Sequence, residues 1–159
     1  MTPNPVLASP ATLDHAGIAQ RIPHQGRMCL LDRLLHWTAS DIVCSATSHR
    51  DTDNPLRSAS GLLALCAIEY AAQAMALHGA LITAACAPPK PGYLGSVRAL
   101  RLAVMRLDDI DGALRVQAER LAGDTRLVSY AFEVLDASGH LLADGRASIV
   151  LNPPTPGAP

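Results

Sequence analysis

Residues 60–86 read SGLLALCAIEYAAQAMALHGALITAAC, and this stretch decides the fold. Apolar side chains cover nearly every side of a helix drawn through it, and Pro88 and Pro89 follow, which cannot continue a helix. Ahead of it, Ser58 or Ser60 can accept hydrogen bonds from the exposed amides of a first turn. A helix that is apolar all round is buried in protein or in lipid. We therefore expect one long buried helix over residues 60–86.

The sequence on both sides of this stretch alternates apolar with polar side chains, most clearly at Val128, Tyr130, Phe132 and Val134. Such a period of two predicts half-buried antiparallel strands. The runs of this kind are 28–36, 42–49, 93–105, 114–119, 128–134 and 140–151. The apolar face of six strands needs an apolar element packed against it, and the apolar helix needs to be buried. The two needs together predict an α+β fold, a six-stranded antiparallel sheet wrapped around one long central helix.

The apolar stretch is also long enough to cross a lipid bilayer, which is the alternative to a core helix. Glu69, Gln73 and His78 lie inside it, and no basic cluster flanks either end. Polar and ionisable groups are rare in membrane spans. The flanking strands also require an apolar partner, so we expect no membrane span.

A chain of 159 residues, 49% of them hydrophobic, is long enough for one core and short for two. We expect a flexible N-terminal tail over 1–14, a single domain over 15–151 and a proline-rich C-terminal tail over 152–159. A formal net charge of −1 gives no electrostatic case for a nucleic-acid partner.

The four cysteines, Cys29, Cys44, Cys66 and Cys86, lie far apart and form no Cys-x-x-Cys pair. This spacing is typical of buried apolar thiols in a reducing compartment, and of neither a disulfide framework nor a metal site. Residues 1–12 lack the pattern of a secretion signal. We therefore expect a cytoplasmic protein.

Glu69 is the sharpest candidate for chemistry, because an ionised carboxylate in an apolar helix is costly unless it is paired or hydrogen-bonded. Gln73 lies one turn further along the same face, where the small side chains of Cys66 and Ala76 leave room. A purely structural role remains open, with Glu69 bonded to backbone or to an arginine such as Arg98 or Arg101.

Histidine is the natural acid-base partner of a carboxylate. His78 lies nine residues from Glu69, which at about 100° per residue places it on the opposite side of the helix, so we expect a core or interface histidine. His36, His49 and His140 stand at expected strand ends or turns, where solvated histidines are ordinary, and His15 precedes the expected core. Pro23 and Gly26 hold His24 at the entrance to the first long strand.

Three segments together resemble a known family. Residues 22–33, IPHQGRMCLLDR, resemble the opening of hot-dog-fold dehydratases that act on β-hydroxyacyl groups held by acyl carrier protein. Residues 68–74, IEYAAQA, resemble the central-helix motif of these enzymes, and residues 92–98, GYLGSVR, resemble the strand that follows. Order and spacing agree over about 18–151, and the nearest variety is the dehydratase of aryl-polyene lipid clusters.

This resemblance implies a hot-dog fold and a dimer, either a homodimer or a heterodimer with another hot-dog subunit. It implies that Glu69 works at the hydroxyl leaving group, and that backbone amides such as those of Gly61 and Leu62 polarise the thioester carbonyl. Gly95 and Arg98 are the remaining substrate-binding candidates. The acyl thioester substrate arrives on the phosphopantetheine of acyl carrier protein, with no other cofactor and no metal. The arginines that the resemblance suggests for contact with this acidic partner are Arg57, Arg98 and Arg101.

The sequence departs from the family at one position. The usual enzymes carry their catalytic histidine in a loop ahead of the helix, supplied to the site by the other subunit, and Pro55 stands at that distance here. We expect His24 to take this role as the base, with Glu69 as the acid and Gln73 orienting it. Two alternatives stay open, an acyl thioesterase and a non-catalytic hot-dog partner subunit.

Overall fold

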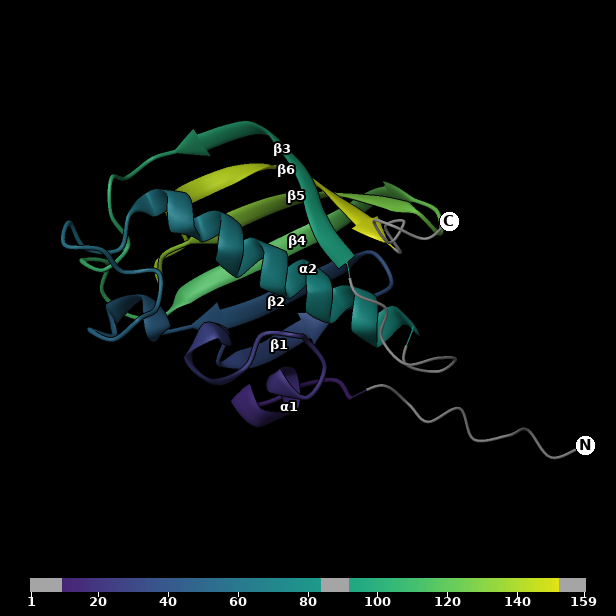
Figure 1. Cartoon of the computed structure of the whole chain (residues 1–159), viewed down its shortest axis with the longest axis horizontal. Helices are drawn as coiled ribbons and strands as arrows, with labels where there is room; N and C mark the ends of the chain where they lie inside the picture. The colour runs from purple at the N-terminus through teal and green to yellow at the C-terminus, as the bar shows by residue number, and fades with distance from the viewer. Residues whose placement is uncertain (1–9, 84–91, 152–159) are drawn as a thin grey trace, which may run out of the picture.

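The computed structural model of the chain describes residues 10–83 and 92–151. A long helix lies along one face of a six-stranded antiparallel sheet (Figure 1). The strands follow the spatial order β1-β2-β4-β5-β6-β3, which places β1 and β3 at the two edges. The elements in chain order are α1 (His15–Ala19), β1 (Arg33–Trp37), β2 (Asp41–Ala46), α2 (Ala67–Thr83), β3 (Gly92–Leu102), β4 (Leu114–Gly123), β5 (Leu127–Leu135) and β6 (Leu141–Leu151). The predicted fold class is confirmed.

The alternation in the sequence determines which side chains face the helix. In β5, Val128, Tyr130, Phe132 and Val134 are buried, while the residues between them are half-buried or exposed. Its neighbours continue the pattern in register, since Phe132 lies opposite Ala118 of β4. Burial of each large apolar side chain contributes about 1.5–3 kcal/mol, so the inner face of the sheet and α2 stabilise one another.

The helix begins later than the sequence predicted. Residues 64–66 form a 3-10 turn, and α2 starts at Ala67. The segment ahead of it is pinned in an extended form, because Ala64 N donates to Met105 O and Leu107 N donates to Leu62 O. The predicted serine cap is wrong, since the Ser58 hydroxyl donates to Gly61 O instead. The predicted end of the helix, at residue 86, lies outside the described residues.

The folded part starts earlier than residue 15. Leu13 bridges Leu34 of β1, and the Trp37 indole N–H donates to Pro10 O at 2.9 Å. Residue His15, expected ahead of the core, begins α1, and its Nδ1 lies 2.9 Å from Leu31 O. Backbone and indole groups of β1 thus find partners in residues ahead of position 15. The predicted C-terminal tail lies outside the described residues.

By length and composition, 64–83 would suffice to cross a membrane. In the structure, however, α2 lies in the curve of the sheet against β2, β4 and β5 (Figure 1). His78 is fully buried, as predicted for a core histidine: its Nδ1 lies 2.9 Å from the Tyr130 hydroxyl and its Nε2 lies 2.8 Å from Thr38 O. These contacts are those of a core helix. They also account for one of the polar groups that the apolar stretch contains.

Two of the expected cysteine environments are confirmed, since Cys29 and Cys44 are buried free thiols and burial raises the pKa of Cys44 to about 12. Cys66 is half-buried, and Cys86 lies outside the described residues. The prediction for His49 is wrong. It is fully buried, and its Nε2 lies 3.0 Å from Ile110 O, so the turn at 48–50 contacts the loop that contains Ile110.

Candidate functional site

Glu69 lies in the first turn of α2, at the end of the helix that faces the loop carrying His24. Its carboxylate is half-buried, with 31% of the side chain exposed. A position in the first turn also suits a carboxylate electrostatically, because helix N-termini carry partial positive charge. The fold thus places an acidic side chain where it keeps contact with solvent and still loses much of its hydration.

The loop that holds His24 is shaped by its own side chains. The Gln25 amide donates to Ala19 O at 2.7 Å and to Ile22 O at 3.2 Å, which fastens the loop to the end of α1. Gly26 then takes a φ of +59°, a left-handed conformation that glycine adopts without strain. This turn directs the chain into the 3-10 segment 26–28 and leaves the His24 ring facing α2.

The structure brings the three predicted catalytic side chains together. His24 Nε2 lies 3.0 Å from Glu69 Oε1, and Gln73 Nε2 donates to the same oxygen at 3.0 Å. Burial raises the pKa of Glu69, but the hydrogen bonds from His24 and Gln73 outweigh it, and the pKa is lowered overall. Glu69 is therefore a carboxylate at neutral pH. The arginine partners considered as its structural alternative are not used, since Arg101 binds Asp144.

Gln73 is fully buried and ties the helix to the segment that follows the histidine loop. Its Nε2 also donates to Met28 O at 2.7 Å, and its Oε1 accepts from Leu30 N at 2.9 Å. With both ends of the amide engaged, its orientation is fixed. The geometry of the His24–Glu69 pair therefore depends on a bracket between α2 and residues 28–30.

The amides predicted to polarise a thioester carbonyl already have partners in the chain. Gly61 N donates to Ser58 O, and Leu62 N donates to Asp108 Oδ1 at 3.0 Å. Asp108, with 3% of its side chain exposed, also binds Arg106 and Arg57 and has a strongly lowered pKa, chiefly because of its hydrogen bond with Arg106. In this conformation neither amide is available to a substrate. The sequence carried no signal for this, since Asp108 is 46 residues from Leu62.

The other two substrate-binding candidates, Gly95 and Arg98, lie on the edge strand β3 and are exposed. Arg98 stands directly opposite Arg146 of β6, so two guanidinium side chains share one face of the sheet. The remaining arginines suggested for a protein partner are engaged: Arg57 binds Asp108 at 3.3 Å, and Arg101 binds Asp144. The structure therefore does not bring Gly95 or Arg98 into contact with Glu69.

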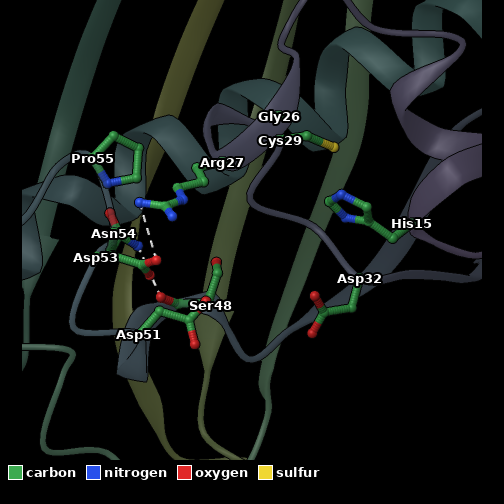
Figure 2. Close-up of a pocket in the computed structure, with 10 residues that line it drawn as sticks. All are labelled: His15, Gly26, Arg27, Cys29, Asp32, Ser48, Asp51, Asp53, Asn54 and Pro55. Carbon is green, nitrogen blue, oxygen red and sulfur yellow. Dashed lines mark hydrogen bonds and ion pairs between the residues drawn. The ribbon is translucent and has the colours of Figure 1, made fainter.

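Pro55, which stands where the family carries its loop histidine, borders a depression of about 370 Å³ (Figure 2). Arg27 and Asp53 also line this depression and form an ion pair, with Arg27 Nη1 3.1 Å from Asp53 Oδ2. Residues from the histidine loop and from the Pro55 loop line this depression together, but its lining includes neither His24 nor Glu69. The histidine of the usual enzymes thus has no counterpart on this loop.

A polar network beneath the Pro55 loop was not anticipated from the sequence. The buried Tyr70 hydroxyl lies 2.9 Å from Ser48 Oγ and accepts from Asn54 Nδ2 at 3.2 Å. Asn54 Oδ1 in turn accepts from Leu56 N, which fixes the turn at Pro55. The sequence signal for this turn was the Asn54-Pro55 pair ahead of the helix, because an asparagine side chain commonly bonds the backbone two residues further on.

The antiparallel sheet around a central helix, with a carboxylate in the first helical turn, defines a hot-dog protein. Solved structures from several organisms share this fold. The dehydratase heterocomplex ApeI:P from Xenorhabdus doucetiae matches with a TM-score of 0.77 and 24% identity, over 87% of this chain and 92% of that one. Thioesterase HI1161 from Haemophilus influenzae gives 0.63 and 10%, over 87% and 90%. A hypothetical thioesterase with coenzyme A from Streptococcus pneumoniae gives 0.55 and 10%, over 75% and 84%.

The family assignment comes from the sequence of the whole folded part. The ApeP-like family, described as ApeP dehydratase, matches residues 16–156. The chain belongs to the ApeP-like dehydratase family. No curated protein matches it.

Proposed function

We propose that this chain removes water from a 3-hydroxyacyl thioester carried on the phosphopantetheine of acyl carrier protein, in lipid synthesis of the aryl-polyene type. The observation that carries the proposal is the 3.0 Å contact between His24 Nε2 and Glu69 Oε1. Elimination of water requires one proton to leave C2 and one to reach the hydroxyl at C3, and positioned acid-base groups perform such transfers. Membership of the ApeP-like dehydratase family supports the same reaction.

Both members of the pair come from one chain, whereas the resemblance implied a histidine from the other subunit. His24 thereby places a histidine beside Glu69 within the subunit, although Pro55 stands where the family carries its loop histidine. Each copy of the chain then carries its own His24–Glu69 pair. This arrangement suits a subunit that works beside a different hot-dog partner as well as one in a homodimer.

The test is turnover of a 3-hydroxyacyl carrier-protein substrate by the purified chain, followed by mass spectrometry. The expected product is the enoyl thioester, lighter by one water. Glu69→Gln should lower the rate by about 10²–10⁴-fold, the usual contribution of an acid-base group. Glu119→Gln, at an exposed carboxylate of β4, is the matched control and should leave the rate unchanged. Full activity in Glu69→Gln would refute the assignment.

Contact with acyl carrier protein is proposed at Arg98 and Arg146. Like charges directly opposite one another are unfavourable in a sheet, and an acidic partner would relieve this repulsion. Arg98→Glu should raise KM for the carrier-bound substrate and leave KM for a short free pantetheine thioester unchanged. Arg115→Glu, at an exposed position of β4, is the control. Equal effects of the two variants would exclude a specific contact at Arg98.

A second hot-dog subunit is the proposed partner in the assembly. The structural neighbour from Xenorhabdus doucetiae is a dehydratase heterocomplex, which supports this proposal. Co-expression with a second hot-dog protein should then yield a stable complex on size-exclusion chromatography. If the chain alone gives no product and the complex does, the alternative of a non-catalytic partner subunit is tested by Glu69→Gln within the complex.

The proposed compartment is the cytoplasm. The described cysteines are free thiols, which supports this proposal.

Thioester hydrolysis is the second candidate, because the ionised Glu69 could activate water as hot-dog thioesterases do with a helix carboxylate. The same mass measurement separates the two reactions. Hydrolysis releases free acid and leaves the carrier thiol, whereas dehydration leaves the acyl group on the carrier.

A further inference from the structure

The two oxygens of the Glu69 carboxylate have different surroundings. Oε1 accepts both hydrogen bonds, from His24 and from Gln73, while no donor among the described residues reaches Oε2. Within the part of the chain that the structure describes, the buried side-chain atoms that lack a partner are Nδ1 of His24 and Nδ1 of His49. Oε2 is not among them, so it lies at the surface of the site. The carboxylate thus presents one unoccupied oxygen outward.

The two nitrogens of His24 also differ, and their surroundings determine where its proton lies. Nε2 faces Glu69 Oε1 at 3.0 Å and donates to that carboxylate. Nδ1 is buried without a partner, so a proton there would be an N–H group without an acceptor, which is unfavourable. The ring therefore carries a proton on Nε2. In this state it has no lone pair that a substrate could reach.

These two observations move the role of base, which the sequence analysis gave to His24, to Glu69. His24 cannot accept the C2 proton, because Nε2 directs its own proton at Glu69 and Nδ1 is buried. An ionised carboxylate with one exposed, unoccupied oxygen can. Gln73 and His24 both hold Oε1, which fixes the plane of the carboxylate and so the direction of Oε2.

We propose that, within the dehydration proposed above, Glu69 Oε2 performs both proton transfers, and that His24 is a positioning residue. Oε2 takes the C2 proton, and the electrons of the C2–H bond pass into the enolate of the thioester. They then form the C2–C3 double bond as the C3–O bond breaks. The leaving oxygen takes the proton back from the Glu69 carboxyl group and departs as water. Glu69 returns to the carboxylate, the thioester stays intact, and no other reactant is needed.

This inference rests on the proposed function, and variants at position 24 test it separately. His24→Gln retains an N–H donor near the position of Nε2 but offers no base. A positioning role predicts that kcat of His24→Gln stays within about tenfold of the parent, whereas a base would cost up to about 10⁴-fold. His24→Leu removes the donor and should lower kcat further than His24→Gln does. Urea unfolding of both variants checks that each is folded under the conditions in which kcat is compared.

The pH dependence of kcat supplies a readout that a merely structural role would not move. With Glu69 as the proton carrier, kcat should stay level as the pH falls through the ordinary histidine range near 6.5, and drop only at lower pH. In His24→Leu this drop should move to higher pH, because Glu69 loses a hydrogen bond that lowers its pKa. An inactive but folded His24→Gln, or a parent kcat that falls near pH 6.5, would overturn the inference. Absence of enoyl product from the parent protein, alone and in complex, would instead refute the proposed function.

Discussion

The bracket formed by Gln73 can be tested by Gln73→Leu, which nearly preserves volume and removes every hydrogen bond of the amide. Gln73 is fully buried and bonds Met28 O at 2.7 Å, Leu30 N at 2.9 Å and Glu69 Oε1 at 3.0 Å. Glu69 keeps its contact with His24, but two backbone groups lose their partners. An unsatisfied buried polar group costs about 1–3 kcal/mol, so the loss of two partners should lower the free energy of unfolding by about 2–6 kcal/mol.

Urea unfolding measures this loss. With a slope of about 2 kcal/mol per M for a domain of this size, the midpoint should drop by roughly 1–3 M. The matched control is Gln117→Leu on β4, whose side chain donates to Glu133 at 2.6 Å on the solvent-facing side of the sheet. Its unfolding free energy should change by less than about 0.5 kcal/mol. Equal midpoints for the two variants would show that Gln73 does not bracket the helix to residues 28–30.

Four further predictions follow from burial, backbone geometry and one hydrogen bond. Burial lowers the pKa of both His49 and His78 from 6.5. As the pH falls, these histidines therefore bind protons in the unfolded chain before they do so in the folded one. The urea midpoint should then fall as the pH drops below 6.5 and through the lower pKa values of the folded state. A midpoint that is level from about pH 7.5 down to about pH 5 would contradict this. Gly79→Ala places a methyl group in open space within α2 and should stabilise the fold by about 0.5–1 kcal/mol in the same assay, and a destabilised variant would disprove the open space. Gly61→Ala should lower the melting temperature, because φ is +91° and the new Cβ would lie 2.7 Å from Asp108 Oδ2; an unchanged melting temperature would mean that the loop adapts. Deletion of residues 1–12 removes the acceptor of the Trp37 indole N–H and should shift its fluorescence emission, whereas an unchanged spectrum would argue against the Pro10 contact.

The sequence by itself determined the layer architecture and one face of the helix. An apolar stretch of helical length and six runs of period two can be buried together in few ways, so the sheet wrapped around α2 followed from local patterns. Helical geometry placed Glu69 beside Gln73 and His78 on the opposite side, and both relations hold in the structure. Each of these depends on residues close in the chain.

Only the tertiary structure decided which groups meet across long stretches of chain. The contact of His24 with Glu69 joins residues 45 apart. The bond from Leu62 N to Asp108 occupies an amide that the family resemblance assigned to the substrate. Burial of His49 depends likewise on a loop 61 residues away. Such contacts are set by packing and by the need of buried polar groups for partners, which a local pattern does not encode. The sequence therefore supplied the carboxylate, and the fold determined which of its oxygens is unoccupied.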